Sequence, residues 1–192
     1  MKIIRTDNFL KLQPSSSDAA GRTITIGNFD GCHLGHIKLF DKTMQIAKAT
    51  QTTPCILTFD PHPLSVLSDA HFKEKQLFTK EQKINFFKQM GFTEIIIQKF
   101  SPSFSQLSCD DFYHTGLRKT LNAQAIVVGE NFLFGHNRRG NSTWLSKNTQ
   151  QDNIQLHLVP KQRIQEKSIS STLIRKLINN EGQLILANKM LG

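Results

Sequence analysis

The feature that most constrains this chain is a ten-residue turn between two apolar stretches. It reads Gly27-Asn28-Phe29-Asp30-Gly31-Cys32-His33-Leu34-Gly35-His36. Apolar and polar residues alternate in 22–26 before it, which predicts a buried strand, and apolar residues recur at helical spacing in 37–47 after it. A helix N-terminus offers unpaired N–H groups and a partial positive charge, which favour an anion such as phosphate. His33 and His36 add donors there, and Gly35, which lacks a Cβ, lets a phosphate approach the backbone.

The turn also indicates a reaction class. No Gly-Lys-Ser/Thr follows it, so it is not a Walker-type phosphate loop. It has the His-x-Gly-His signature of nucleotidyltransferases instead, in a long form that begins at Gly27 and follows a strand. The alternative is a pair of surface histidines on a loop without function.

Short β-like runs alternate with helical patterns along the chain, which predicts an α/β fold with a parallel sheet and helices on both faces. Strands are expected at 23–27, 54–59, 94–98, 125–129 and 155–160. Helices are expected at 36–49, 80–90, 108–121, 171–180 and 182–191. The segment 61–79 looks irregular, and the segment 135–152 is polar, with Gly, Asn, Ser and Arg. Both follow strand ends, where such sheets bind ligands, so we expect active-site loops there.

Composition narrows the class of protein. The 192 residues suit one domain, and the chain shows neither a membrane-length apolar run nor a signal peptide at its start. The three cysteines are far apart, without metal-ligand spacing, which predicts reduced thiols in a cytoplasmic protein. The net charge is +9, but Lys and Arg are spread along the chain, so nucleic-acid binding is allowed and not required.

A second anion site is expected near the C-terminal end. Ser170, Ser171 and Thr172 are residues that cap a helix N-terminus. Arg175 follows one turn later, where it can bracket an anion held by that cap. A cap with no other role is the alternative.

Two further blocks follow strand ends. In the first, Pro61 and Pro63 stiffen the loop around His62, which then walls a ring-binding pocket or is only a turn residue. In the second, Phe134 follows Asn131 beyond the fourth predicted strand, where an aromatic ring can stack on a flat ligand or belong to the core.

These four blocks, in this order, resemble the FAD synthetase domain of the prokaryotic bifunctional riboflavin kinase/FAD synthetase family, from about Gly21 to Gly192. The resemblance implies a Rossmann-like nucleotidyltransferase fold and the transfer of AMP from ATP to FMN, with Mg²⁺ and with ATP and FMN as small-molecule substrates. It implies that His33, His36 and Arg175 are catalytic. It assigns ATP binding to Gly27, Phe29, Asp30, Gly35, Ser170, Ser171 and Thr172. It assigns FMN binding to Pro61, His62, Pro63, Phe112, Asn131 and Phe134, with Asn131 also linked to Mg²⁺.

The resemblance leads us to expect one FMN adenylyltransferase domain over residues 1–192, with no riboflavin kinase domain. Adenylyl transfer by direct attack of the FMN phosphate needs no protein nucleophile, so the protein positions the substrates and stabilises charge. Two alternatives stay open: a nucleotidyltransferase for another phosphorylated acceptor, and a flavin- or nucleotide-binding regulator without catalysis. The oligomeric state is not predicted.

Overall fold

The computed structural model describes residues 1–13, 20–67, 76–179 and 182–192. Within these ranges the chain builds a six-stranded sheet in the order β1-β4-β3-β2-β5-β6, and all neighbouring strands are parallel. The strands are β1 (Lys2–Thr6), β2 (Arg22–Ile26), β3 (Thr53–Asp60), β4 (Glu94–Lys99), β5 (Ala123–Gly129) and β6 (Gln155–Val159). The chain runs outward from β2 to β3 and β4 on one side, and β5 and β6 lie on the other. This reversal at β2 opens a crevice at the carboxyl ends of β2 and β5, where open parallel sheets bind ligands.

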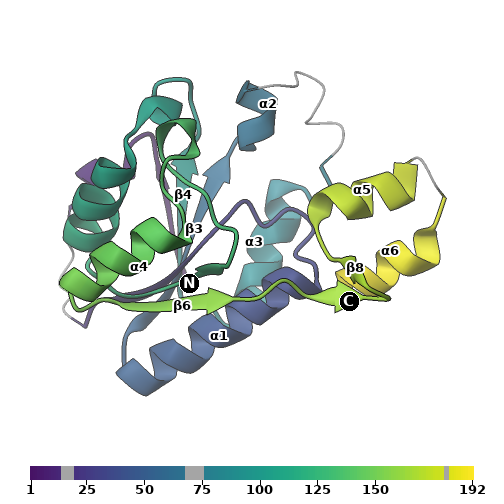
Figure 1. Ribbon diagram of the computed structural model, residues 1–192, viewed down its shortest axis with the longest axis horizontal. Helices are drawn as coiled ribbons and strands as arrows, with labels where there is room; N and C mark the ends of the chain where they lie inside the picture. The colour runs from purple at the N-terminus through teal and green to yellow at the C-terminus, as the bar shows by residue number, and fades with distance from the viewer. Residues whose placement is uncertain (14–19, 68–75, 180–181) are drawn as a thin grey trace.

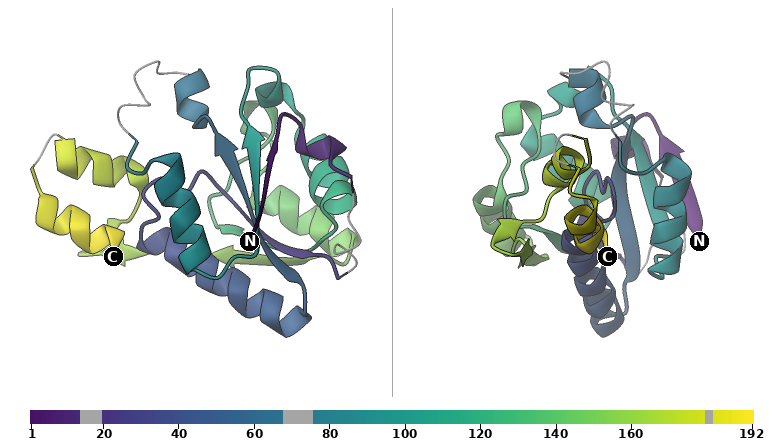
Figure 2. Two further views of the ribbon diagram at one scale, coloured as in Figure 1. Left: turned by 180° about the vertical axis from the view of Figure 1, so that it is seen from behind. Right: turned by 90° about the vertical axis from the view of Figure 1, so that its right-hand side faces the viewer.

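Helices cover both faces of the sheet (Figures 1 and 2). One face packs on α1 (Leu34–Thr50) and α3 (Lys80–Gln89), and the other packs on η1 (Phe9–Lys11), the π-helix η5 (Asp111–Thr120) and α4 (Ser142–Gln151). Successive residues of a strand point to opposite faces of the sheet, so a strand can contribute side chains to both cores. The first core contains Ile24, Leu57, Ile96, Ile126, Tyr113 and Leu145, and the second contains Ile56, Ile95, Val127, Phe40 and Phe87. Packing in the two cores therefore determines where the loop after each strand lies.

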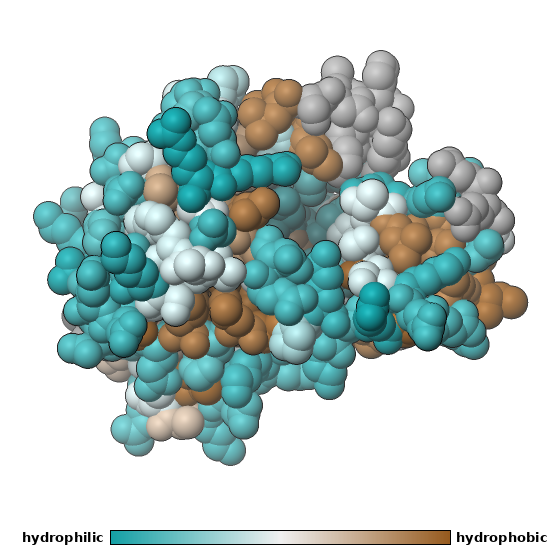
Figure 3. Space-filling model, in the orientation of Figure 1, coloured by the Kyte–Doolittle hydropathy of each residue, from teal (hydrophilic) through white to brown (hydrophobic). Residues whose placement is uncertain are grey.

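A smaller unit stands at one end of the molecule (Figure 1, right). It consists of the hairpin β7 (Arg163–Ile164) and β8 (Lys167–Ser168), followed by α5 (Ser171–Asn179) and α6 (Leu184–Leu191). Its own core holds Ile169, Ile174, Leu177, Ala187 and Met190, and Leu34 at the start of α1 packs against it. Figure 3 shows hydrophobic surface at this end and a hollow between it and the rest of the molecule.

The sequence predictions of fold class are confirmed: the sheet is parallel, helices lie on both faces, and the five expected strands form with bounds shifted by one or two residues. Strand β1 was not predicted, because its adjacent Ile3 and Ile4 do not alternate with polar residues. The prediction of an active-site loop at 135–152 is wrong over α4, whose first turn is capped by Asn141.

The irregular segment predicted at 61–79 also needs correction, because it contains the short helix α2 (Pro63–Leu67), and residues 68–75 lie outside the described residues. The predicted helices near the C-terminus form as α5 and α6. Residue 180 of the first of them lies outside the described residues.

Candidate active site

A cavity of about 920 Å³ opens at the carboxyl ends of β2, β3 and β5. Its size lies at the upper end of the range typical of ligand sites. Most of the predicted site residues line it: Gly27, Phe29, Asp30, His33, His36, His62, Pro63, Phe112, Asn131, Phe134, Ser170, Ser171, Thr172 and Arg175. Two predicted residues are not among its lining residues, Gly35 and Pro61. The structure therefore gathers residues from opposite ends of the sequence around one cavity.

The histidine turn places two imidazoles at the start of α1. His33 is the N-cap of α1, and its Nδ1 accepts a hydrogen bond from the backbone N–H of His36 at 3.3 Å. The two rings stack with centroids 3.6 Å apart and planes 15° apart. The Phe29 and His36 rings form a T-shaped contact at a centroid distance of 5.3 Å, which packs the pair against the core. Ring contacts within the turn thus orient the two imidazoles.

Two glycines in this turn make room for protein side chains. A Cβ on Gly35 would lie 3.2 Å from the His33 ring. The absence of a side chain at Gly35 therefore leaves room for the His33 imidazole over the first turn of α1. The expectation that Gly35 admits a phosphate directly to the backbone needs correction, since the His33 ring fills the space beside it and Gly35 does not line the cavity. A Cβ on Gly27 would lie 2.9 Å from the Phe29 ring, which is almost fully buried.

Burial keeps both histidines neutral near pH 7. It lowers the pKa of His33 to about 4 and, together with the neighbouring charge of a protonated His33, lowers the pKa of His36 well below its usual value. Because Nδ1 of His33 accepts from the backbone, the neutral ring carries its proton on Nε2. His33 therefore presents a neutral N–H donor, a group that can stabilise charge on a phosphate oxygen.

The neighbouring Cys32 takes no part in nucleophilic chemistry. Burial raises the pKa of the Cys32 thiol to about 12, and its Sγ lies 3.5 Å from the carbonyl oxygen of Phe29. A protonated, buried thiol is a poor nucleophile.

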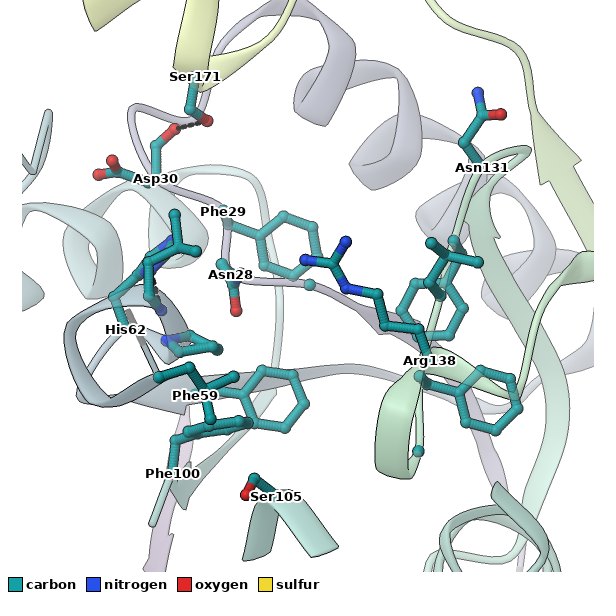
Figure 4. A pocket seen from close by; sticks show the side chains of 18 of the residues that line it. Asn28, Phe29, Asp30, Phe59, His62, Phe100, Ser105, Asn131, Arg138 and Ser171 are labelled. Carbon is teal, nitrogen blue, oxygen red and sulfur yellow. Dashed lines mark hydrogen bonds between the residues drawn. The ribbon is translucent and has the colours of Figure 1, made fainter. Parts of the chain in front are cut away.

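The start of α5 docks onto the histidine turn through Asp30. The Ser171 hydroxyl donates to the Asp30 carbonyl oxygen at 2.8 Å (Figure 4). Arg175 Nη1 lies 2.7 Å from Asp30 Oδ2 in an ion pair that is largely buried. The Asp30 carboxylate also accepts from the backbone N–H groups of Leu77 at 3.0 Å and Phe78 at 3.2 Å. One aspartate thus joins three segments that are distant in sequence.

The serine and threonine hydroxyls of α5 have distinct roles. Ser170 Oγ accepts from the backbone N–H of Leu173 at 3.2 Å, so the predicted cap of α5 is confirmed. Thr172 Oγ1 lies 3.5 Å from Arg175 Nη2. The two predicted anion sites, the histidine turn and the start of α5, therefore face one cavity, and Arg175 reaches it as the partner of Asp30 rather than as a separate charge.

The proline-flanked loop contributes one buried imidazole. His62 is buried and lines the cavity, and its Nδ1 accepts from the backbone N–H of Leu64 at 3.2 Å. Burial lowers the pKa of His62 to about 4. Pro63 also lines the cavity, whereas Pro61, which follows a cis peptide bond, is exposed and is not among the lining residues.

The opposite wall of the cavity is aromatic. Phe134 stacks on Phe132 with centroids 5.4 Å apart and planes 14° apart, and it packs edge-on against Trp144. Only 7% of Phe134 is exposed, so this predicted flavin residue is also part of the core, as is Phe112 beside it. The half-buried Phe132 offers more surface to the cavity. Asn131 lies exposed at the rim, and its amide nitrogen is 3.4 Å from Glu130 Oε1.

Several lining residues were not predicted from the sequence. On the aromatic side they include Phe59, Phe100 and Phe104, whose rings contact one another at centroid distances of 5.7–6.1 Å. Lys83, which does not line the cavity, contacts the histidine turn: its Nζ donates to the Asn28 carbonyl oxygen at 3.4 Å, and burial lowers its pKa. No motif marks Lys83, because it stands among other charged residues on α3.

A comparison with known protein families identifies the family of this chain. The family described as FAD synthetase matches residues 15–173. The chain belongs to the FAD synthetase family. Bifunctional riboflavin kinase/FMN adenylyltransferase of Buchnera aphidicola (subspecies Schizaphis graminum) is 36% identical over 193 residues, which is all of this chain and 60% of that protein. The protein of that name from Listeria monocytogenes is 34% identical over 171 residues, 89% of this chain and 54% of that protein. This FAD synthetase family member thus spans about 54–60% of the length of those two relatives.

Solved structures support the fold of this FAD synthetase family member. A crystal structure described as a macrolide-efflux protein from Streptococcus pneumoniae superposes with a TM-score of 0.83 at 24% identity, over all of this chain and 60% of that one. At that identity the likeness concerns the fold alone. No helix in the described part of the chain is long and apolar enough to cross a membrane.

Proposed function

We propose that this chain transfers AMP from ATP to FMN, giving FAD and pyrophosphate, with residues 1–192 acting as one FMN adenylyltransferase domain. One observation carries the proposal: a single cavity joins an anion-binding end, made by the histidine turn and the start of α5, to an aromatic wall beyond β5. ATP and FMN are both polyanions with flat rings, and a site that joins them needs these two kinds of surface. The proposal agrees with the names of the relatives described above.

The chemistry fits residues that position substrates and stabilise charge. An oxygen of the FMN phosphate attacks the α-phosphorus of ATP, a new P–O bond forms, and the bond to the bridging oxygen of pyrophosphate breaks with its electron pair. We assign to His33 and His36 the role of donors to the α-phosphate, where negative charge increases in the transition state. Arg175 and the hydroxyls of α5 hold the leaving phosphates, and the Asp30 ion pair fixes the direction of Arg175.

The residues present fit a magnesium ion that is held mainly by substrate. In the part of the chain that the structure describes, no cluster of three or more His, Cys, Asp or Glu side chains could hold a metal. Mg²⁺ needs few protein ligands when phosphates supply the others. Asn131, which lines the cavity at its rim and offers an amide oxygen, is the residue that would hold it. When bound, the ion would neutralise charge on the phosphate oxygens.

The cellular compartment and the partners of the chain are also proposals. We infer a cytoplasmic protein because Cys32, Cys55 and Cys109 are all free thiols. We expect no nucleic-acid partner, since the cavity suits small polyanions. A mobility-shift assay with duplex DNA at physiological salt checks this expectation.

The test of function is incubation of the purified chain with ATP, Mg²⁺ and FMN, followed by chromatography of the flavins. FAD should accumulate only when all three are present. If FMN stays unchanged while another phosphorylated acceptor is adenylylated, the alternative nucleotidyltransferase is correct. If no acceptor is adenylylated but FMN and ATP bind, the chain is a binding protein without catalysis.

A further inference from the structure

Arg138 belongs to the cavity but to none of the motifs from which the function was inferred. It ends η6 (His136–Arg138), in the connection from β5 to α4, and it lines the cavity. Figure 4 shows its side chain extending from this connection across the cavity, with the guanidinium directed toward Phe29. Arg138 and its neighbour Arg139 are both exposed, but Arg139 does not line the cavity. Of these two adjacent arginines, the structure directs only one inward.

The backbone holds Arg138 in that position. Phe134 and Gly140 exchange two backbone hydrogen bonds of 3.0 Å, which close the connection into a loop. Within the loop the N–H of Arg138 donates to the Gly135 carbonyl oxygen at 3.0 Å. Arg138 has a φ of 56°, a left-handed conformation that arginine seldom adopts. Such strain persists only where the surroundings impose it and is concentrated at functional positions.

The base of this loop is anchored to the body of the protein. The N–H of His136 donates to the Leu107 carbonyl oxygen at 2.7 Å. A Cβ on Gly135 would lie 2.7 Å from the backbone nitrogen of Cys109, so the loop rests directly on the segment that leads into η5. The guanidinium of Arg138 therefore extends from a fixed base rather than from a free surface loop.

Within the described residues, no carboxylate neutralises the charge of Arg138. The other arginine that lines the cavity, Arg175, forms an ion pair with Asp30. Among the described residues Arg138 has no carboxylate within ion-pair distance and no side-chain hydrogen bond. A guanidinium presents a planar fork of N–H donors that matches the oxygens of a phosphate. The cavity thus holds a cation ready for an anionic group of the ligand.

We propose that Arg138 binds the phosphate of FMN and thereby distinguishes FMN from riboflavin, which has the same ring system without a phosphate. The inference rests on the proposed function. Arg138 comes from the connection that also carries Phe132 and Phe134, so it extends from the aromatic wall toward the histidine turn. A flavin with its rings at that wall carries its phosphate along the same direction, between the rings and the histidines.

The test compares flavin binding by Arg138→Gln and by the matched control Arg139→Ala. FMN and riboflavin are each titrated by quenching of flavin fluorescence. Hydrogen bonds to charged groups are among the strong ones, so Arg138→Gln should weaken FMN binding by about 10- to 100-fold. Riboflavin binding should change less than about twofold, because riboflavin offers no phosphate to the guanidinium. Arg139→Ala should bind both flavins as the unmodified chain does, and Arg138→Lys should recover part of the FMN affinity.

Steady-state kinetics add a second readout. Arg138→Gln should raise KM for FMN and leave KM for ATP unchanged. Equal losses for both flavins would show a structural role, a rise in KM for ATP alone would assign Arg138 to the nucleotide, and unchanged FMN affinity would remove it from the site. Each of these results overturns the inference. If the unmodified chain makes no FAD, the proposed function fails. If it makes FAD while Arg138→Gln binds FMN normally, only the inference fails.

Discussion

Asp30→Asn should destabilise the protein more than any other single isosteric change in the turn. The Asp30 side chain is 3% exposed and its partner Arg175 is 12% exposed, so the substitution removes a carboxylate charge from a largely buried guanidinium. The Asn amide keeps one acceptor oxygen for Leu77 and Phe78, whose N–H groups now reach the carboxylate. Its NH₂ group would then face Arg175, and both groups are donors.

The size of the effect follows from this geometry. Removing one partner of a buried ion pair costs about 3–5 kcal/mol. Arg175 keeps its contact with Thr172 and some access to water, so we expect the lower end of the range, about 3 kcal/mol. In a chain of this size each kcal/mol shifts Tm by about 2–4 °C, so Tm should fall by roughly 6–12 °C.

Urea denaturation followed by the fluorescence of Trp144, the single tryptophan, measures the change. The matched variants are Arg175→Met and the double variant with Asp30→Asn. The double variant should lose clearly less free energy than the two single losses together, because it leaves no unpaired charge. A loss below about 1 kcal/mol for Asp30→Asn, or losses that simply add, would refute the account of this ion pair.

The remaining predictions concern the histidines and the aromatic wall. His36→Ala should lower kcat for FAD formation by about 100-fold or more, as expected for the loss of one preorganised donor, and near-normal turnover would contradict this role. The unfolding free energy should fall as the pH is lowered from about 6.5 to 4, because the unfolded chain binds protons in that window while His33 and His62, with pKa values of about 4, stay neutral. Each should contribute roughly 3 kcal/mol to that loss, and His62→Gln should flatten the dependence in urea titrations at several pH values. Phe134→Ala should cost about 3–5 kcal/mol of stability, whereas Phe132→Ala should mainly weaken FMN binding in calorimetric titrations.

The sequence was sufficient to predict the elements that obey a simple period. The strand and the helix on either side of the histidine turn, and the parallel sheet, followed from apolar spacing. The edge strand β1 was missed because its adjacent Ile3 and Ile4 pack against opposite cores, so apolar and polar residues do not alternate. The helix α4 was missed because few of its residues are buried, which leaves little periodicity in its sequence. In α4 only Leu145 and Thr149 are buried. Asn141, which caps that helix, was the available signal.

The sequence predicted which residues form the site better than it predicted the contacts between them. Sequence spacing marked Asp30 and Arg175 separately, but their ion pair joins positions 145 residues apart and depends on the docking of α5. The stacking of His33 on His36 depends on the space beside Gly35, which the motif alone explains differently. Arg138 stood in a segment predicted to be an active-site loop, but nothing in the sequence separates it from Arg139.

The central claim is that the FMN phosphate attacks the α-phosphorus of ATP directly in this cavity. ATP labelled with ³²P at the α-position tests it in one measurement, by following the label into flavin, pyrophosphate and protein after rapid quenching. The account predicts that all transferred label appears in FAD, in amounts equal to the pyrophosphate released, and that none is bound to the protein. Label in a product other than FAD, or attached covalently to the chain during turnover, would contradict it.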